Sequence, residues 1–519
     1  MFWQAYVGLD DKDSNQIALH LYQGGLSLPN RDYYLDDSPA MSSIRTKYEQ
    51  FYGDATALLS PVHADKWSAV IDVEQRIAKA SWTDVALRDV QKNYTKLPLD
   101  SLSTQLDGFN WQNYFEGLGW NQSSDYIIVN QLEFIEKIIA IFASTPLETI
   151  KAYLSWQLVN RSLNWFSEAA STLNFAFYGT VVNGIKEQKP LWKRASLMLD
   201  SLPIGEIVGR EYAARHFPES SKQAVLALVE DVRSAYHTRI DRLTWMGDAT
   251  KQRAHRKLDN LKVFMGYPSV WKDFSALKFS DNLLENLLLA AAFETDLELA
   301  KVGHAPAEED WEMNAHTVNA YHHPNRLEIV FPAAILQPPF FDPSASYATN
   351  MGGIGAVIGH ELTHGFDDQG SEFDEYGNSH PWQSDEERKK FFELAENIVQ
   401  LADAFETVPG TYLQGKLVLG EAIADVGGVE LAVEALKQKA TNTDQLESEL
   451  DDLFVNFARA ECGTATAERL VQLAKTDPHP PSPFRVNAVV NHVDAFYERY
   501  DVQPTDTLYL PPEQRAKIW

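Results

Sequence analysis

The sequence has a single cysteine, Cys462, among 519 residues. An intramolecular disulfide is therefore impossible, which excludes the small secreted folds that disulfide bonds hold together. A reducing cytoplasm is the compartment that this composition favours, so we expect a cytoplasmic protein. We expect Cys462 to be a small buried residue and not a catalytic nucleophile.

Long apolar runs are also missing. Runs such as 138–143 and 287–293 are far shorter than the ~20 residues that cross a bilayer as a helix. Residues 1–5 contain no basic region followed by an apolar stretch, so no signal peptide is visible. We therefore expect no membrane partner.

Positive charge is scarce. Lys and Arg number 45 against 73 Asp and Glu, which gives a net charge of −28 and a pI near 4.9. This balance argues against nucleic acid or an anionic membrane as partner. The apolar content of 45% is enough for a large core, and the length of 519 residues predicts two lobes. We expect a monomer.

The most informative segment is His360-Glu361-Leu362-Thr363-His364. Two histidines four apart on a helix project from one face, where both imidazoles can bind one Zn²⁺. The glutamate between them lies beside the metal, where it can take a proton from a zinc-bound water. Apolar residues at helical spacing across 354–362 predict a buried helix, and the glycines around it indicate close packing. The motif predicts metal-assisted hydrolysis, most often of a peptide bond.

A catalytic zinc usually has a third protein ligand. The position six residues beyond His364, where some zinc peptidases have a third histidine, is Gly370. The position nineteen residues beyond His364, where zinc aminopeptidases have a glutamate, is Gln383. The acids at 385–387 follow Ser384 and precede three basic residues, which is typical of a solvated helix start.

Glu421 is the strongest candidate for the third ligand. It lies one helical turn before Asp425, so both carboxylates share a helix face. One can bind the metal, while the other accepts the free ring N–H of a ligating histidine and fixes its tautomer. Apolar neighbours favour burial, and buried carboxylates need such partners. Taken alone, the segment fits an ordinary amphipathic helix with exposed acids equally well.

Four separated segments resemble the neprilysin family of zinc endopeptidases, which includes endothelin-converting enzyme and bacterial oligopeptidase O. The segments are 318–321, 329–341, 357–368 and 420–425, and weaker similarity covers the rest of the chain. The resemblance implies that His360, His364 and Glu421 bind one Zn²⁺, with Glu361 as the general base and Asp425 as the carboxylate behind the ligands.

The same resemblance implies the substrate contacts. Asn319 and Ala320 match an edge strand that hydrogen-bonds the substrate backbone. Independently, the alternating runs 317–321 and 327–331 predict a hairpin, and an edge strand can capture an extended peptide. His479 matches the residue that stabilises the oxyanion of the tetrahedral intermediate, and Arg485 the one that binds a substrate carbonyl.

The fold implied by the resemblance is mainly α with a small β component (α+β). It is a two-lobed gluzincin-type metallopeptidase, in which a helical lobe roofs a thermolysin-like catalytic lobe. We place the first part of the catalytic lobe at 1–90, the helical lobe that covers the substrate chamber at 91–281, and the zinc-binding catalytic lobe at 282–519. Such a chamber admits oligopeptides and excludes folded proteins. Cleavage is expected on the N-terminal side of apolar residues.

The residues of the middle block agree with a helical lobe. Amphipathic stretches at 223–244 and 249–264 predict long helices. Trp156, Trp165 and Trp192 are expected to belong to the core.

Departures from the family pattern keep two other hypotheses open. Ala422 stands where asparagine is usual and His322 where an aromatic residue is usual, which predicts altered fine specificity. The resemblance begins almost at Met1, whereas relatives have a further N-terminal helical block; we expect either an upstream start or a shortened variant with an exposed apolar patch. A catalytically impaired peptide-binding relative and a zinc aminopeptidase of another family are the alternatives.

Overall fold

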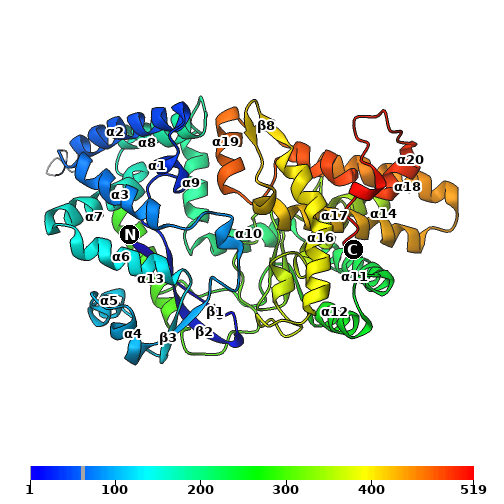
Figure 1. Ribbon diagram of the computed structural model, residues 1–519, viewed down its shortest axis with the longest axis horizontal. Helices are drawn as coiled ribbons and strands as arrows, with labels where there is room; N and C mark the ends of the chain where they lie inside the picture. Colours follow the sequence, from blue (N-terminus) through cyan, green and yellow to red (C-terminus); the bar gives the residue numbers. More distant parts are fainter. Residues whose placement is uncertain (1, 60–62, 64) are drawn as a thin grey trace. The chain divides into compact units, whose positions relative to one another are not determined.

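The computed structural model describes residues 2–59, 63 and 65–519 (Figure 1). The chain forms two compact units. Unit 1 comprises residues 1–203, 273–306 and 466–472, and unit 2 comprises residues 204–272, 307–465 and 473–519. Each unit has a separate hydrophobic core. Helices predominate in both and the sheets are small, as the α+β prediction requires.

Unit 1 contains one four-stranded sheet and a set of helices. Its elements are β1 (Trp3–Asp10), β2 (Asp13–Gln23), α1 (Asp32–Leu35), α2 (Pro39–Leu59), α3 (Trp67–Ala80), η2 (Ala86–Arg88), β3 (Thr95–Pro98), α4 (Leu99–Gln105), α5 (Trp111–Leu118), β4 (Tyr126–Val129), α6 (Leu132–Ser144), α7 (Leu147–Ser162), η3 (Leu163–Trp165), α8 (Glu168–Asn174), η4 (Phe175–Val182), α9 (Leu191–Asp200) and α13 (Leu283–Leu299).

Unit 2 contains the zinc-motif helix. Its elements are α10 (Gly205–His216), α11 (Glu219–Arg242), α12 (Asp248–Asn260), β5 (Lys262–Gly266), β6 (Tyr321–His323), β7 (Glu328–Pro332), α14 (Tyr347–Asn350), η5 (Met351–Gly355), α15 (Ala356–His364), η6 (Gly370–Glu372), α16 (Asp385–Asp403), β8 (Glu406–Val408), β9 (Thr411–Tyr412), α17 (Gly415–Lys439), α18 (Thr443–Ala460), η7 (Phe484–Ala488), α20 (Asp494–Tyr500) and η8 (Pro512–Gln514). Helix α19 (Ala467–Thr476) begins in unit 1 and ends in unit 2.

The core of unit 1 is built from aromatic side chains on α2, α3 and α7, and it encloses one carboxylate. Trp156 is 1% exposed, as predicted for the core. Its indole N–H donates to the Tyr48 hydroxyl, which in turn donates to Glu74. Ser27, Tyr34 and Gln157 also donate to Glu74, so this buried carboxylate is fully hydrogen-bonded. The sheet of unit 1 has the strand order β1-β2-β4-β3.

The small sheet of unit 2 carries the predicted hairpin. Strands β6 and β7 pair antiparallel, with Tyr321 opposite Val330, and the sheet order β5-β7-β6 leaves β6 at an edge. The hairpin is confirmed, but its first strand begins at Tyr321 and not at 317. β6 lies beside α15, so the edge strand and the zinc motif belong to one region of unit 2.

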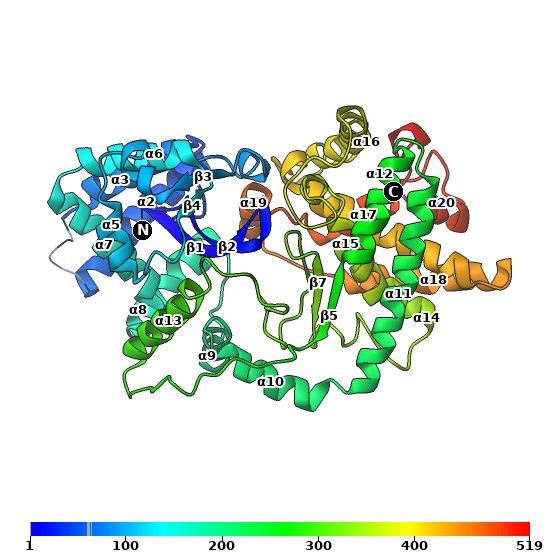
Figure 2. The same ribbon diagram turned by 90° about the horizontal axis from the view of Figure 1, so that it is seen from below.

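A helical segment with a π-helical middle leads into the zinc motif. α14, η5 and α15 follow one another without a break across residues 347–364. Glycines at this point allow the backbone of α15 to touch that of α17, and the labels of the two helices stand next to each other in Figure 2. A Cβ atom on Gly359 would lie 2.8 Å from the Gly428 Cα, and one on Gly353 would lie 2.2 Å from the Phe340 carbonyl oxygen. The close packing predicted from the glycines is therefore confirmed at these two positions.

We expect Gly359→Ala to lower the free energy of unfolding by about 1–3 kcal/mol, because the added methyl group overpacks the contact between α15 and α17. Denaturant unfolding of the zinc-loaded protein measures this change. Gly53→Ala is the matched control, since nothing lies within 4 Å of a Cβ atom there; alanine in that helix is expected to be neutral or stabilising. Equal stability of the Gly359 variant and wild type would contradict the packing argument.

Several local predictions are corrected by the structure. Cys462 is exposed, because it follows the end of α18 in a surface segment. Trp192 is 66% exposed on α9, a helix that has no buried residue. The helix predicted at 249–264 ends at Asn260, and Lys262–Gly266 forms β5, where pairing with β7 outweighs helical propensity. Trp165 is only partly buried.

The predicted lobe boundaries have no simple counterpart in the compact units. Residues 1–90 lie with 91–203 in unit 1, and 204–272 lie with the zinc-motif helix in unit 2. The assignment of 1–90, 91–281 and 282–519 to the lobes of the family stays a prediction. Met1 lies outside the described residues. Of the helices described, each is too short or too polar to cross a bilayer.

Candidate metal centre and active site

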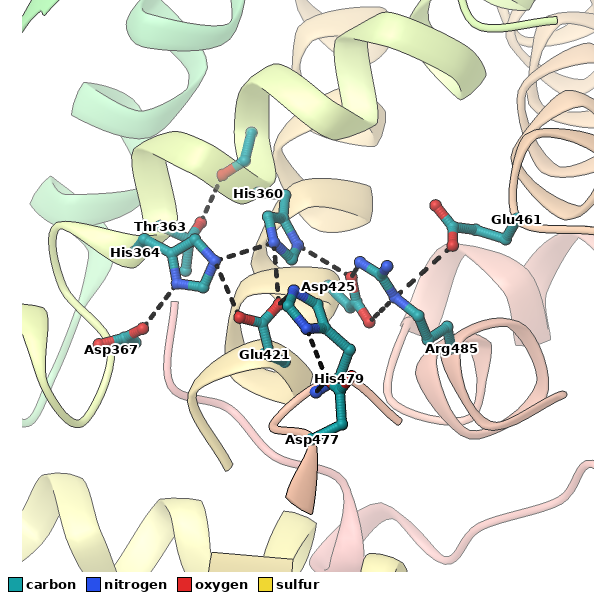
Figure 3. A network of polar contacts seen from close by, with 11 residues as sticks. His360, Thr363, His364, Asp367, Glu421, Asp425, Glu461, Asp477, His479 and Arg485 are labelled. Atoms are coloured by element: carbon teal, nitrogen blue, oxygen red, sulfur yellow. Dashed lines mark hydrogen bonds and ion pairs between the residues drawn. The ribbon is translucent and has the colours of Figure 1, made fainter. Parts of the chain in front are cut away.

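Helices α15 and α17 bring the three predicted zinc ligands together (Figure 3). The Nε2 atoms of His360 and His364 are 2.9 Å apart. The Glu421 carboxylate faces both, with Oε2 at 3.3 Å from the His360 Nε2 and Oε1 at 3.6 Å from the His364 Nε2. Over the described part of the chain, this is the only group of three or more His, Cys, Asp or Glu whose ligand atoms all lie within 4.8 Å of one another.

A second carboxylate holds each imidazole in place. The His360 Nδ1 lies 2.9 Å from Asp425 Oδ1, and the His364 Nδ1 lies 2.7 Å from Asp367 Oδ2. An ionised carboxylate can only accept, so each Nδ1 carries the proton that it donates. In the neutral rings both Nε2 atoms then present lone pairs, which is the tautomer that a metal requires.

These three groups fit Zn²⁺. Two lone pairs face each other at 2.9 Å, and the buried Glu421 Oε2 has no hydrogen-bond donor among the described residues. Such an arrangement is repulsive unless a cation or extra protons lie between the atoms. With zinc–ligand bonds of ~2.0–2.1 Å, the edges of a ligand tetrahedron are about 3.3–3.4 Å. The observed separations of 2.9, 3.3 and 3.6 Å bracket that length.

The charge balance of the cluster agrees with a cation site. Burial lowers the pKa of His360, but the nearby carboxylates of Asp425 and Glu421 outweigh this effect and raise the pKa to about 10. Burial raises the pKa of Glu421, yet the two imidazoles hold it well below its usual range. Without metal the cluster therefore binds protons, and a metal ion replaces them.

Glu361 lies between the two histidines in sequence and is only 5% exposed. Its carboxylate makes no hydrogen bond to any residue that the structure describes. Burial raises the pKa of Glu361, while the neighbouring His360 and His364 oppose the shift. A carboxylate with a raised pKa and no structural partner suits a general base that acts near neutral pH.

His479 approaches the cluster from the segment after α19. Its Nε2 lies 3.3 Å from Glu421 Oε2, and its Nδ1 lies 2.9 Å from Asp477 Oδ1. Burial lowers the pKa of His479, but the hydrogen bond to Asp477 and the charge of Glu421 raise it overall. The structure thus brings His479 to the metal cluster, where a cationic ring can face developing negative charge.

Arg485, at the start of η7, binds the carboxylate behind His360. Its Nε and Nη2 donate to the two Asp425 oxygens at 2.9 and 2.5 Å, which is a bidentate pair. Its Nε also lies 3.5 Å from Glu461 Oε2 (Figure 3). Asp425 therefore accepts hydrogen bonds from the His360 imidazole and from the Arg485 guanidinium.

The predicted substrate strand begins directly after Asn319 and Ala320. Asn319 is exposed and Ala320 is buried, immediately before edge strand β6. The residues 385–387, considered above as ligands, instead open α16. Ser384 caps that helix in a capping box with Glu387, so the prediction of a solvated helix start is confirmed.

Sequence reasoning missed three residues of the site. Asp367 is three residues after His364, and a helical i, i+3 pattern would have pointed to it. Asp477 is two residues before its partner His479, and the backbone N–H and Nδ1 of His479 both contact its Oδ1, which is a local loop contact. Glu461 has no signal, because it is 24 residues from Arg485 and the contact exists only in the folded chain.

We expect Asp367→Asn to weaken zinc binding by about 10–100-fold, because the amide no longer fixes the proton on the His364 Nδ1. Competition against a zinc chelator of known affinity measures the effect. Asp385→Asn, at the exposed first turn of α16, is the control. An unchanged zinc affinity in the Asp367 variant would show that Asp367 does not orient the ligand.

Comparisons with known proteins agree with this site. Residues 1–268 and residues 319–516 match two sequence profiles of peptidase family M13. The chain is 29% identical to endothelin-converting enzyme 1 of Mus musculus, over 100% of this chain and 70% of that protein. It is 30% identical to membrane metallo-endopeptidase-like 1 of Mus musculus, over 99% of this chain and 71% of that protein.

Solved structures show the same fold. The crystal structure of the zinc metalloprotease Zmp1 of Mycobacterium tuberculosis with an inhibitor superposes with a TM-score of 0.95 at 34% identity, covering 100% of this chain and 80% of that chain. The crystal structure of PepO from Lactobacillus rhamnosis, at 24% identity, has a TM-score of 0.89 and supports the fold alone. These matches show that the chain belongs to peptidase family M13, as a zinc-dependent endopeptidase of short peptides.

Proposed function

We propose that His360, His364 and Glu421 hold the catalytic Zn²⁺ and that Glu361 is the general base for cleavage of peptide bonds within oligopeptides. The observation that carries this proposal is the convergence of two imidazole Nε2 lone pairs and one carboxylate beside a buried, unpaired glutamate. When bound, Zn²⁺ supplies Lewis-acid activation of water and of the scissile carbonyl.

Other side chains of the protein transfer the proton, orient the ligands and stabilise the oxyanion. The Glu361 carboxylate takes the proton from the attacking water and returns it to the amine that leaves. Asp425 and Asp367 keep the Nδ1 protons in place, so that the two imidazoles keep their Nε2 atoms directed at the metal. His479 donates to the oxyanion, and the Asp477 hydrogen bond supports its charged form.

Substrate binding is assigned to the edge strand and Arg485. An extended peptide adds along the edge of the sheet at Asn319 and Ala320, which directly precede β6, because an edge leaves a row of backbone groups for pairing. Arg485 has one guanidinium nitrogen, Nη1, without a partner among the described residues, and this nitrogen binds a substrate carbonyl. We propose cleavage on the N-terminal side of apolar residues. The monomeric state and the cytoplasmic location stay predictions.

A graded series of peptides, from dipeptides to a folded protein, tests the function. We expect internal bonds of intermediate-length peptides to be cut, with an apolar residue after the cut, and product masses identify each bond. Stepwise loss of N-terminal residues would favour an aminopeptidase. Binding of peptides without cleavage at full zinc loading would favour a peptide-binding protein.

A further inference from the structure

Two carboxylates flank the Arg485 guanidinium, although one is enough to neutralise it. Asp425 takes the Nε and Nη2 edge in a bidentate pair. Glu461 lies on the Nε side at 3.5 Å, and its side chain is 16% exposed. The end of α18 fixes its position, because the backbone N–H of Glu461 donates to the Phe457 carbonyl. Glu461 has no role in the chemistry proposed above.

The second carboxylate changes the charge that a substrate meets. If Asp425 were the only carboxylate beside Arg485, the two side chains together would have no net charge. The free Nη1 would then bind a substrate carbonyl or a substrate carboxylate. When it is ionised, Glu461 adds one negative charge, and its Oε2 lies 3.5 Å from the Nε of the same guanidinium. A neutral carbonyl dipole feels this charge weakly, whereas a substrate carboxylate beside Arg485 is repelled by it at low local dielectric.

We propose that Glu461 is a specificity-determining residue that discriminates against peptides with a carboxylate beside Arg485. This inference rests on the proposed contact between Arg485 and the substrate. The inference deepens the proposed function, because Glu461 would favour peptides whose group beside Arg485 is a neutral amide. A substrate carboxylate can come from the free C-terminus or from an acidic side chain, and both have the same chemistry.

Matched peptide pairs test the proposal. In the first pair, one peptide ends in a free C-terminal carboxylate and the other in a C-terminal amide. In both peptides this terminal group lies a few residues after the bond that is cut. A second pair, amidated throughout, differs only in Glu against Gln at the same position. The readout is the ratio of kcat/KM for the charged peptide to that for its neutral partner. In Glu461→Gln we expect this ratio to rise about tenfold in at least the pair whose carboxylate reaches Arg485.

The controls separate charge from structure. Glu461→Asp keeps the charge and is expected to keep a ratio near that of wild type. Glu461→Ser removes the charge with a smaller side chain and must raise the ratio as Glu461→Gln does. Glu447→Gln changes an exposed acid on the same helix and is expected to leave the ratio unchanged. A structural disturbance of Arg485 would slow both members of a pair alike and would not move the ratio.

The outcomes are distinct. An unchanged ratio for both pairs in Glu461→Gln and Glu461→Ser, with zinc bound, overturns the role of Glu461 and leaves the proposed function intact. Failure of the wild-type enzyme to cut any of the neutral peptides overturns the proposed function itself. A rise in one pair only identifies which carboxylate, terminal or side-chain, lies beside Arg485.

Discussion

Glutamine in place of Glu361 is expected to lower kcat by about 10²–10⁴-fold while zinc stays bound. The amide has nearly the shape of the carboxylate, so the buried surroundings of residue 361 need not change. It cannot accept a proton from water or deliver one to the leaving amine. Because Glu361 binds no other described residue, the loss is expected in the chemical step and not in folding.

Steady-state kinetics and zinc analysis on the same preparation measure both parts of this prediction. In wild type, burial raises the pKa of Glu361, so activity is expected to fall as pH decreases through that raised pKa. If Glu361 causes this fall in activity at low pH, the residual activity of Glu361→Gln is expected not to show it. Glu386→Gln, at the exposed start of α16, is the matched control. A variant at position 361 with wild-type kcat would disprove the assignment.

Loss of zinc is expected to abolish measurable hydrolysis and to lower the stability of the protein. The ligand cluster places two Nε2 lone pairs 2.9 Å apart beside the Glu421 carboxylate. Without the ion, this arrangement must take up protons or open. A metal that binds only the folded state adds about 2.7 kcal/mol at a free concentration of 100 times Kd. Removal of zinc withdraws that contribution.

Calorimetry before and after dialysis against a chelator measures the stability change, and addition of Zn²⁺ is expected to restore both Tm and activity. His364→Ala should reproduce the zinc-free state in the presence of zinc. His380→Ala, at an exposed position outside the cluster, serves as its control. Full activity of the chelated enzyme, or of His364→Ala, would rule out the proposed metal centre.

The local parts of the site were predictable because they depend on helix periodicity. A repeat of 3.6 residues puts His360 and His364 on one face of α15, and Glu421 and Asp425 on one face of α17. The capping box at Ser384 is equally local, and it is present. Errors arose where a partner outside the segment decides the structure. Lys262–Gly266 is a strand because β7 pairs with it, and Trp192 is exposed because α9 is not covered.

The sequence by itself determined that this chain carries a metal-ligand pair, a base between the ligands and a candidate third ligand, since side chains a few residues apart are placed by their own helix. Only the tertiary structure decided which carboxylates meet at Arg485. Asp425, Glu461 and Arg485 come from α17, the end of α18 and η7. Their meeting depends on how these helices pack, including the glycine contact of α15 with α17, and no local pattern encodes that distance.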